Sequence, residues 1–247
     1  MLKQVKGVLR LNLDDLAVHA GVLGGLFLVV HVITALAVRF SGEGSSLMLS
    51  GVLLPVVGAF VLLIISVGHV LLTFDQAVRF GRTRRRALAL TMGQILIESA
   101  FVTALAAGLT WLERTFAPAL WLKLSGRHVI HWGVDGMRIP EGMQAEYEVL
   151  WRDILFIEDF ALDWWVPPLI LLLGAAAGLV VGAVVQRFGK WGAWSLWALW
   201  MGFFLIFNRL PWRTHEVVNW LVPLLAVIGV AGLLWSVWSL LHATIKT

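Results

Sequence analysis

The sequence predicts an all-α polytopic membrane protein with six transmembrane helices. Of its 247 residues, 60% are hydrophobic and only 14% are Asp, Glu, Lys or Arg, whereas soluble domains carry roughly 25% of these charged residues. The mean hydropathy is +0.86. A spanning helix needs about 20 mostly apolar residues. The segments of suitable length are Leu16–Val38, Leu47–Thr73, Ala87–Leu112, Trp164–Val185, Trp191–Phe207 and Val217–Leu241.

The first fifteen residues, Met1–Asp15, precede the first apolar segment and have a pattern of their own. Apolar residues recur at helical spacing, with lysine and arginine between them. This pattern is typical of a short amphipathic helix on the inner membrane surface. A frayed terminus without regular structure is the alternative. The apolar positions are Leu2, Val5, Val8 or Leu9, and Leu13, and the basic ones are Lys3, Lys6 and Arg10.

The distribution of basic residues predicts the orientation. Lysine and arginine gather before the first segment, between the second and third, between the fourth and fifth, and at the end of the chain. With six spans these regions all lie on one side, and short basic loops face the cytoplasm. We therefore expect cytoplasmic N- and C-termini. Arg209 and Arg213, on the opposite side, weaken this bias without reversing it.

The region 113–163 is expected to form the one sizeable loop outside the cytoplasm. Asp135-Gly136 is a common hairpin turn pair, and the residues around it alternate as in short strands. From Ala145 to Trp164 apolar residues step by three and four, which predicts an amphipathic helix leading into the fourth span. The predicted organisation is 1–15, 16–112 with a cytoplasmic loop at 74–87, 113–163, and 164–247.

Two spans carry small residues at a spacing that allows helices to approach closely. In lipid, association of helices depends on close packing along such faces. We expect packing through these glycines, within one subunit by default. They are Gly21 and Gly25 in the first span, and Gly174, Gly178 and Gly182 in the fourth.

Polar residues inside the spans are the candidates for function. Glu98 lies well inside the third span, where a carboxylate costs several kcal/mol, and His31 lies in the middle of the first. Both are predicted to line a substrate path; for Glu98 the alternative is a protonated, internally hydrogen-bonded carboxyl. His19 and His69 lie at similar predicted depths in neighbouring spans, and haem iron between them is a further alternative.

Several classes of chemistry are excluded by what the sequence lacks. It contains no cysteine, so neither disulfides nor thiolate metal sites are possible. The nearest string to a nucleotide-binding loop, GAVVQRFGK, has the wrong spacing and is followed by tryptophan. We expect neither hydrolytic activity nor a metal or cofactor in this chain.

The most basic stretch, FDQAVRFGRTRRRA at Phe74–Ala87, lies between the second and third spans and holds five arginines. A run of this kind fixes which side faces the cytoplasm. We also expect a cytoplasmic partner to bind here; a topology signal alone is the alternative.

This stretch and its continuation, ALALTMGQILIESAFVTALAAGLTWLE, resemble permease subunits of bacterial ATP-binding-cassette exporters of the type-2 class. The pattern is an apolar segment at Ala77–Phe80, Gly81, the basic residues Arg84–Arg86, and Glu113 closing the span. LLLGAAAGLVVGAVVQRFGKWG, a glycine-rich fourth span, is similar as well. The resemblance covers most of the membrane part but not the long outer loop.

The resemblance implies a transporter of the bacterial cytoplasmic membrane. Such permeases are homo- or heterodimers served by separate ATPase subunits, which bind ATP and Mg²⁺, and they export amphipathic or hydrophobic substrates such as peptide antibiotics, drugs or lipids. The loop between the second and third spans docks on the ATPase as a coupling helix, with Phe74, Val78 and Phe80 as anchors. Here the coupling residues are Phe74, Asp75, Gln76, Val78, Arg79, Phe80, Gly81, Arg82, Arg84, Arg85 and Arg86.

Two other functional hypotheses remain open at this stage. One is a redox membrane anchor with haem between His19 and His69. The other is a non-transporting immunity or binding protein that sequesters a toxin through the outer loop.

Overall fold

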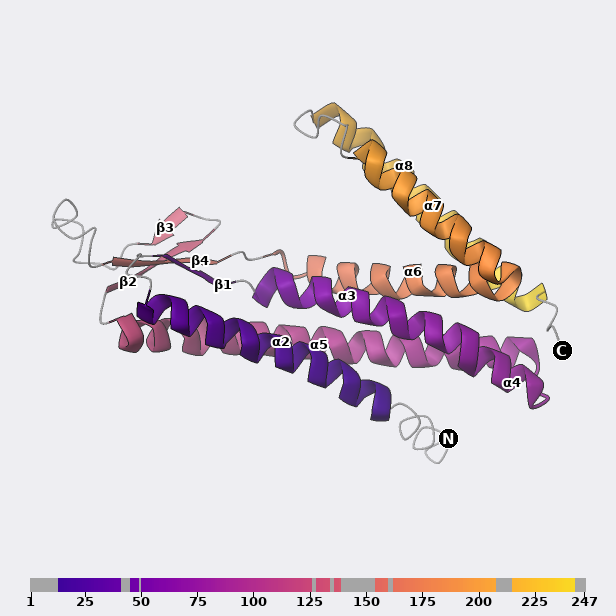
Figure 1. Ribbon diagram of the computed structural model, residues 1–247, viewed down its shortest axis with the longest axis horizontal. Helices are drawn as coiled ribbons and strands as arrows, with labels where there is room; N and C mark the ends of the chain where they lie inside the picture. The colour runs from indigo at the N-terminus through magenta and orange to yellow at the C-terminus, as the bar shows by residue number, and fades with distance from the viewer. Residues whose placement is uncertain are drawn as a thin grey trace. The chain divides into compact units, whose positions relative to one another are not determined.

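The structure, a computed structural model, describes residues 13–40, 45–48, 50–125, 128–133, 136–138, 154–159, 162–207 and 215–242. Met1–Asp15, where the surface helix is expected, lies outside these residues except for its last three, which begin helix α2. The described part is mainly helical (Figure 1). Its helices are α2 (Leu13–Phe40), α3 (Ser50–Gly68), the π-helix η1 (His69–Phe74), α4 (Asp75–Arg79), α5 (Arg84–Ser125), α6 (Val166–Phe188), α7 (Lys190–Phe207) and α8 (His215–His242).

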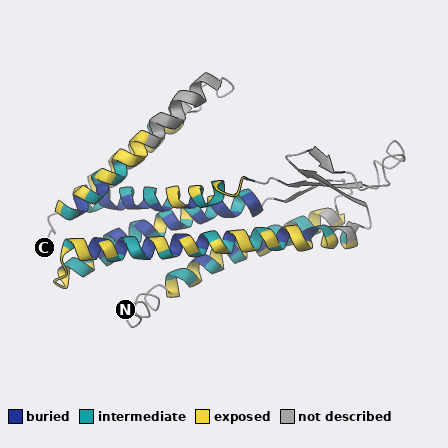
Figure 2. Ribbon diagram, turned by 180° about the vertical axis from the view of Figure 1, so that it is seen from behind, coloured by how far each residue is buried: buried dark blue, intermediate teal, exposed yellow. Residues whose placement is uncertain are grey.

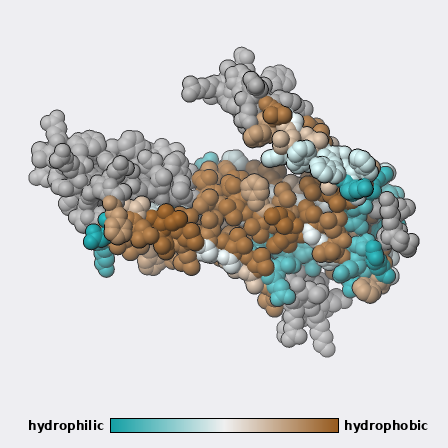
Figure 3. All heavy atoms as spheres, in the orientation of Figure 1, coloured by the Kyte–Doolittle hydropathy of each residue, from teal (hydrophilic) through white to brown (hydrophobic). Residues whose placement is uncertain are grey.

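Among the described residues, four helical stretches are long and apolar enough to cross a membrane. In the most apolar 18-residue segment of each stretch, only 11–33% of the residues are buried. Much of the apolar surface therefore lies on the outside, as Figures 2 and 3 show. This is the surface of a membrane-embedded protein, because exposed apolar area of this extent needs lipid or a partner to cover it. The stretches are Leu13–Ala37, Ser50–Arg79, Arg84–Leu120 and Val166–Phe188.

Helices α7 and α8 coincide in position with the fifth and sixth predicted spans. The described side chains of α8 include a shorter apolar stretch, Val227–His242. The count of six spans therefore stays a prediction, whereas four membrane-length helices are present.

The chain divides into two compact units, and several helices run through both. Unit 1 comprises residues 1–59 and 98–172. Within it, α2, α3, α5 and α6 meet at Gly58. A Cβ added at Gly58 would lie 2.8 Å from Leu171 Cδ2 and 2.9 Å from Val102 Cγ1, and Leu23 is also within reach. Glycine is thus required here because neighbouring side chains already occupy the space.

Unit 2 comprises residues 60–97 and 173–247. Its core includes Phe74, which is 1% exposed, together with Leu62 and Leu240. In this unit α3 and η1 pack against α6 through two glycines. A Cβ at Gly178 would collide with the Leu63 carbonyl oxygen, and one at Gly182 would lie 2.7 Å from Val70 Cβ.

A four-stranded sheet belongs to unit 1, in the order β1-β4-β2-β3. Strand β4 (Ile154–Asp159) is parallel to both β1 (Ser45–Met48) and β2 (His128–Gly133). Strand β2 pairs antiparallel with β3 (Gly136–Arg138), with His131 opposite Arg138. The β2–β3 pair occupies the place where the sequence predicts a hairpin.

The predicted amphipathic helix at Ala145–Trp164 is wrong over residues 154–159, which form β4. The segment ILFIED is short and contains two isoleucines and a phenylalanine, residue types that favour strands. Spacing alone does not separate strand from helix in so short an apolar run. Pairing with two neighbouring strands decides it. Residues 145–153, 160 and 161 lie outside the described residues.

Two predicted boundaries also need correction. Leu47, the expected start of the second span, lies in β1, and α3 begins at Ser50. The third span was expected to end at Leu112, with an outer loop from Glu113, but α5 continues to Ser125. The Glu113-Arg114 pair resembles a membrane boundary. Glu113 is nevertheless 4% exposed, because its carboxylate has partners inside unit 1.

Candidate functional site

The basic turn, defined as Arg79–Arg86, connects α4 to α5 in unit 2. Gly81 has a φ of +81°, a conformation that glycine adopts without steric cost. Backbone hydrogen bonds close the turn: Phe80 N donates to Gln76 O over 2.9 Å, and Arg82 N donates to Ala77 O over 3.0 Å. Thr83 Oγ1 accepts a bond of 3.4 Å from Arg86 N at the start of α5. The turn is therefore short and internally bonded.

The turn continues the second apolar helix directly. The backbone stays in the right-handed helical region at Gly68, Phe74 and Asp75, so α3, η1 and α4 form one continuous helical path. The residues for which the resemblance implies a separate coupling helix are thus the end of the second apolar helix followed by a tight turn. A force on the turn acts directly on that helix.

Side chains also link the basic turn and α4 to α6 and α8. Asp75 Oδ2 pairs with Arg79 Nε over 2.7 Å, and its Oδ1 accepts a hydrogen bond of 3.4 Å from Gln186 Nε2 in α6. Arg84 Nη1 donates to the carbonyl oxygen of Leu241 in α8 over 3.2 Å. These bonds all lie within unit 2, and they connect one cationic turn to two helices far along the chain.

The face that the turn offers is cationic with one aromatic side chain. Phe80 is 85% exposed, and Arg82, Arg85 and Arg86 are exposed beside it. Figure 3 shows hydrophilic residues at the α4 end of the described surface, among other places. An exposed aromatic side chain surrounded by arginines is a common composition for a protein-binding hot spot.

The predicted anchors of the basic stretch have different surroundings. Phe74 is buried and belongs to the core of unit 2, so its side chain is not accessible to a partner in this structure. It faces inward because its helix continues unbroken from α3 and keeps the apolar face of that helix. Val78 is half-buried and Gln76 is exposed. Phe80 is the anchor that remains accessible.

Glu98 in α5 faces His19 in α2 inside unit 1. Both side chains are 0% exposed, and His19 Nε2 lies 3.7 Å from Glu98 Oε2. Asp15 lies one helical turn before His19, and one of its carboxylate oxygens is within 4.8 Å of one of Glu98. Glu98 thus has the His19 imidazole and a second carboxylate near it within unit 1.

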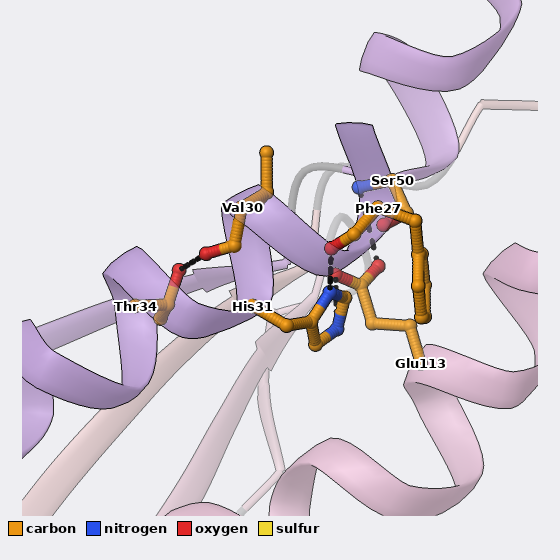
Figure 4. Close-up of polar contacts among 6 residues, drawn as sticks. All are labelled: Phe27, Val30, His31, Thr34, Ser50 and Glu113. Carbon is orange, nitrogen blue, oxygen red and sulfur yellow. Dashed lines mark hydrogen bonds and ion pairs between the residues drawn. The ribbon is translucent and has the colours of Figure 1, made fainter. Parts of the chain in front are cut away.

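A second histidine–carboxylate pair lies farther along the same two helices (Figure 4). His31 Nδ1 donates to the Phe27 carbonyl over 2.8 Å, and His31 Nε2 lies 3.4 Å from Glu113 Oε1. Glu113 Oε2 accepts a hydrogen bond of 3.2 Å from Ser50 N, the first residue of α3. This His31–Glu113 node thus joins α2, α3 and α5.

The hydrogen bonds at the node have clear directions. Because a carbonyl oxygen only accepts, the bond to Phe27 uses a proton on Nδ1 of His31. The Ser50 N–H, at the first residue of α3, donates to Glu113 and so has its partner outside its own helix.

Sequence analysis singled out His31 and Glu98 but assigned partners to neither. It treated His19 only as an alternative haem ligand and Glu113 only as the end of a span. The signal lies in the spacing: His19 and His31 are twelve residues apart, and Glu98 and Glu113 are fifteen apart. Two helices running in the same direction can match such pairs at two depths.

The two glycine faces differ. Gly178 and Gly182 are in close packing with α3 and η1, as described above, and Gly174 is half-buried. By contrast, a Cβ at Gly21 or Gly25 would meet no described atom within 4 Å. The expected close approach at the first span is therefore not made by the described residues of this chain.

His69, the second candidate haem ligand, lies in unit 2 at the start of η1. Its Nδ1 is 3.3 Å from Thr73 Oγ1.

Comparison with protein-family models, curated proteins and solved structures gave no match for this chain.

Proposed function

We propose that this chain is the permease subunit of an ATP-driven exporter in the bacterial cytoplasmic membrane. ATP is hydrolysed by a separate ATP-binding-cassette ATPase, and the substrate is amphipathic or hydrophobic, such as a peptide antibiotic, a drug or a lipid. The permease works with a second copy of itself or with a related permease. The basic turn is the site at which the ATPase binds.

One structural observation carries the proposal. The basic turn exposes Phe80 among arginines, and it is bonded through Asp75 and Arg84 to α6 and α8. A partner that moves the turn therefore pulls on three membrane helices at once. Such an element is required if ATP-driven closure of soluble subunits is to move membrane helices. The resemblance of the same residues to exporter permeases agrees with this role.

Co-purification of the chain with an ATP-binding-cassette ATPase from its native membranes tests the proposal. We expect Phe80→Ala combined with Arg85→Glu to remove the ATPase from the purified complex, because both the apolar anchor and the charge complementarity are lost. The matched control combines Phe116→Ala with Arg39→Glu. Phe116 is also an exposed phenylalanine, and Arg39 is also exposed, but both lie outside the turn.

The control variant should retain the ATPase at the level of the unmodified chain. An unmodified chain that purifies without any ATPase contradicts the proposal. So does a turn variant that keeps its ATPase and its transport activity.

A further inference from the structure

Arg187, in the last turn of α6, lies beside three aromatic rings, all of them in unit 2. Its guanidinium carbon, Cζ, is 5.3 Å from the ring centroid of Trp238. The corresponding distances are 5.8 Å to Phe188 and 6.0 Å to Trp235. Phe188 and Trp235 are stacked, with ring centroids 6.2 Å apart and planes within 3° of parallel. A cation within about 6 Å of an aromatic ring is attracted to its face, so these rings position the Arg187 side chain between α6 and α8.

The guanidinium of Arg187 keeps most of its hydrogen-bonding capacity. It has five N–H donors, and among the described residues only Ser239 Oγ accepts from it, over 3.3 Å from Nη1. No carboxylate in the described part of the chain forms an ion pair with it. The side chain is also exposed. A positioned, exposed cation with unused donors is suited to binding an anion.

Acidic side chains do not neutralise this part of the molecule. Asp75 is the only acid of unit 2 whose side chain the structure describes, and its carboxylate is already bonded to Arg79 and Gln186. The basic residues with described side chains are the five arginines of the basic turn together with Arg187 and Lys190. A ligand for this region is therefore negatively charged. Phosphate groups fit best, because the planar guanidinium binds them through paired N–H donors.

The position of Arg187 favours a phosphate group that belongs to a lipid. Helix α6 is one of the four membrane-length helices, and Arg187 is its penultimate residue. The end of a spanning helix lies at the level of the lipid headgroups, where tryptophan is enriched and arginine reaches toward water. Phe188 and Trp238 are 52% and 49% exposed, so both rings offer apolar surface beside the cation. An anionic phospholipid has the matching parts, a negatively charged headgroup and apolar chains.

We propose that Arg187 binds the phosphate of an anionic phospholipid whose acyl chains lie along the exposed rings of Phe188 and Trp238. From the sequence, Arg187 contributes only to the predicted orientation. The proposal does not rest on the exporter function, because it concerns a lipid that stays bound at the surface and not a transported one. A lipid at this site contacts α6 and α8 together and so connects the ends of these two helices.

Native mass spectrometry of the full chain, released from detergent, tests the proposal. The delipidated chain is mixed with phosphatidylglycerol or, at the same concentration, with phosphatidylcholine, whose headgroup carries a cation beside the phosphate, and the bound lipids are counted. We expect the first phosphatidylglycerol to bind at least about tenfold more tightly than phosphatidylcholine, the ratio that a charge-assisted hydrogen bond provides. Arg187→Gln should weaken phosphatidylglycerol binding by about the same factor, because it removes the charge.

Arg39→Gln is the matched control. Arg39 is exposed in the last turn of α2 and is followed by the exposed Phe40, so it repeats the Arg-Phe pair that ends α6. Among the described residues no aromatic ring lies over its guanidinium, and we expect this variant to bind phosphatidylglycerol as the unmodified chain does. Trp238→Leu removes the nearest ring from Arg187 and should also weaken binding. It keeps the test available if Arg187→Gln does not fold.

Inorganic phosphate distinguishes a lipid site from a site for a free anion. At the concentration of the lipid it should leave phosphatidylglycerol bound, because it lacks the chains that contact the rings. The proposal is overturned if it displaces the lipid, if phosphatidylglycerol and phosphatidylcholine bind equally, or if folded Arg187→Gln and Trp238→Leu chains bind phosphatidylglycerol as tightly as the unmodified chain. Loss of the ATPase from Arg187→Gln with lipid binding unchanged overturns it too, and assigns Arg187 to the protein partner.

Discussion

Arg84, at the first position of α5, donates a hydrogen bond of 3.2 Å from Nη1 to the carbonyl oxygen of Leu241 near the end of α8. The two residues are 157 positions apart in the chain. Leu241 lies in the last turn of α8, where the carbonyl groups have no partner within the helix. Arg84 satisfies one of them, and the positive charge suits that helix end.

The Arg84–Leu241 bond predicts a separation between binding and coupling. In Arg84→Gln the charged donor is removed, while Phe80 and the exposed arginines are unchanged. We expect the ATPase to co-purify normally but its substrate-stimulated hydrolysis to fall. ATPase assays in proteoliposomes measure this. Arg39→Gln, at an exposed position outside the turn, serves as the control, and equal losses in both variants contradict the specific role of Arg84.

The two phenylalanines of the basic stretch predict opposite phenotypes. Phe74→Ala removes a fully buried ring and should destabilise the protein by about 3–5 kcal/mol. Phe80→Ala removes an exposed ring and should leave stability within about 0.5 kcal/mol, while weakening ATPase binding. Unfolding of each variant in detergent, followed by tryptophan fluorescence, distinguishes them. Equal stability of the two variants means that Phe74 is not in the core.

The packing of α3 against α6 predicts a glycine requirement at one position and not at another. Gly178→Ala places a methyl group against the Leu63 carbonyl and should destabilise by about 1–3 kcal/mol, as overpacking does. Gly25→Ala meets open space among the described residues and should be neutral or stabilising by about 0.5–1 kcal/mol. Thermal unfolding of both variants tests this. If Gly178→Ala leaves the stability unchanged, α3 and α6 do not approach each other closely at Gly178.

The His31–Glu113 node predicts a coupled loss of stability. Glu113→Ala leaves the buried Ser50 N–H without its acceptor, at a cost of about 1–3 kcal/mol. The double variant with His31→Ala should cost less than the sum of the single variants, with a coupling of about 0.5–3 kcal/mol. Denaturant unfolding of the four proteins measures the coupling. Additive effects show that the two side chains do not interact.

Much of the helical framework follows from the sequence because apolar length alone specifies a helix in lipid. In water-free hydrocarbon the backbone must satisfy its own hydrogen bonds, so each long apolar run becomes a helix. The starts of α6 and α8 lie within two residues of the predicted ones, and Pro167 and Pro168 fall in the first turn of α6, where proline is tolerated.

The remaining features depend on contacts between segments distant in the chain. Strand β4 is stabilised by pairing with β1 and β2, and no local sequence pattern predicts those partners. Glu113 is buried inside α5, where its carboxylate lies beside the His31 ring and accepts a hydrogen bond from Ser50 N. His19 lies beside the Glu98 carboxylate only because α2 and α5 lie together. Phe74 and Phe80 look alike in sequence, but Phe74 lies within the continuous helical path and faces the core, whereas Phe80 follows the end of α4 and is exposed.

Cross-linking from position 80 tests the central claim most directly. Because the chain contains no cysteine, Phe80→Cys introduces a single reactive thiol on the basic turn. We predict that a short thiol-directed cross-linker joins this residue to the ATP-binding-cassette ATPase in native membranes, and that a membrane-impermeant thiol reagent labels it only from the cytoplasmic side. Labelling from the outer side, or the absence of any ATPase in the cross-linked product, contradicts the account.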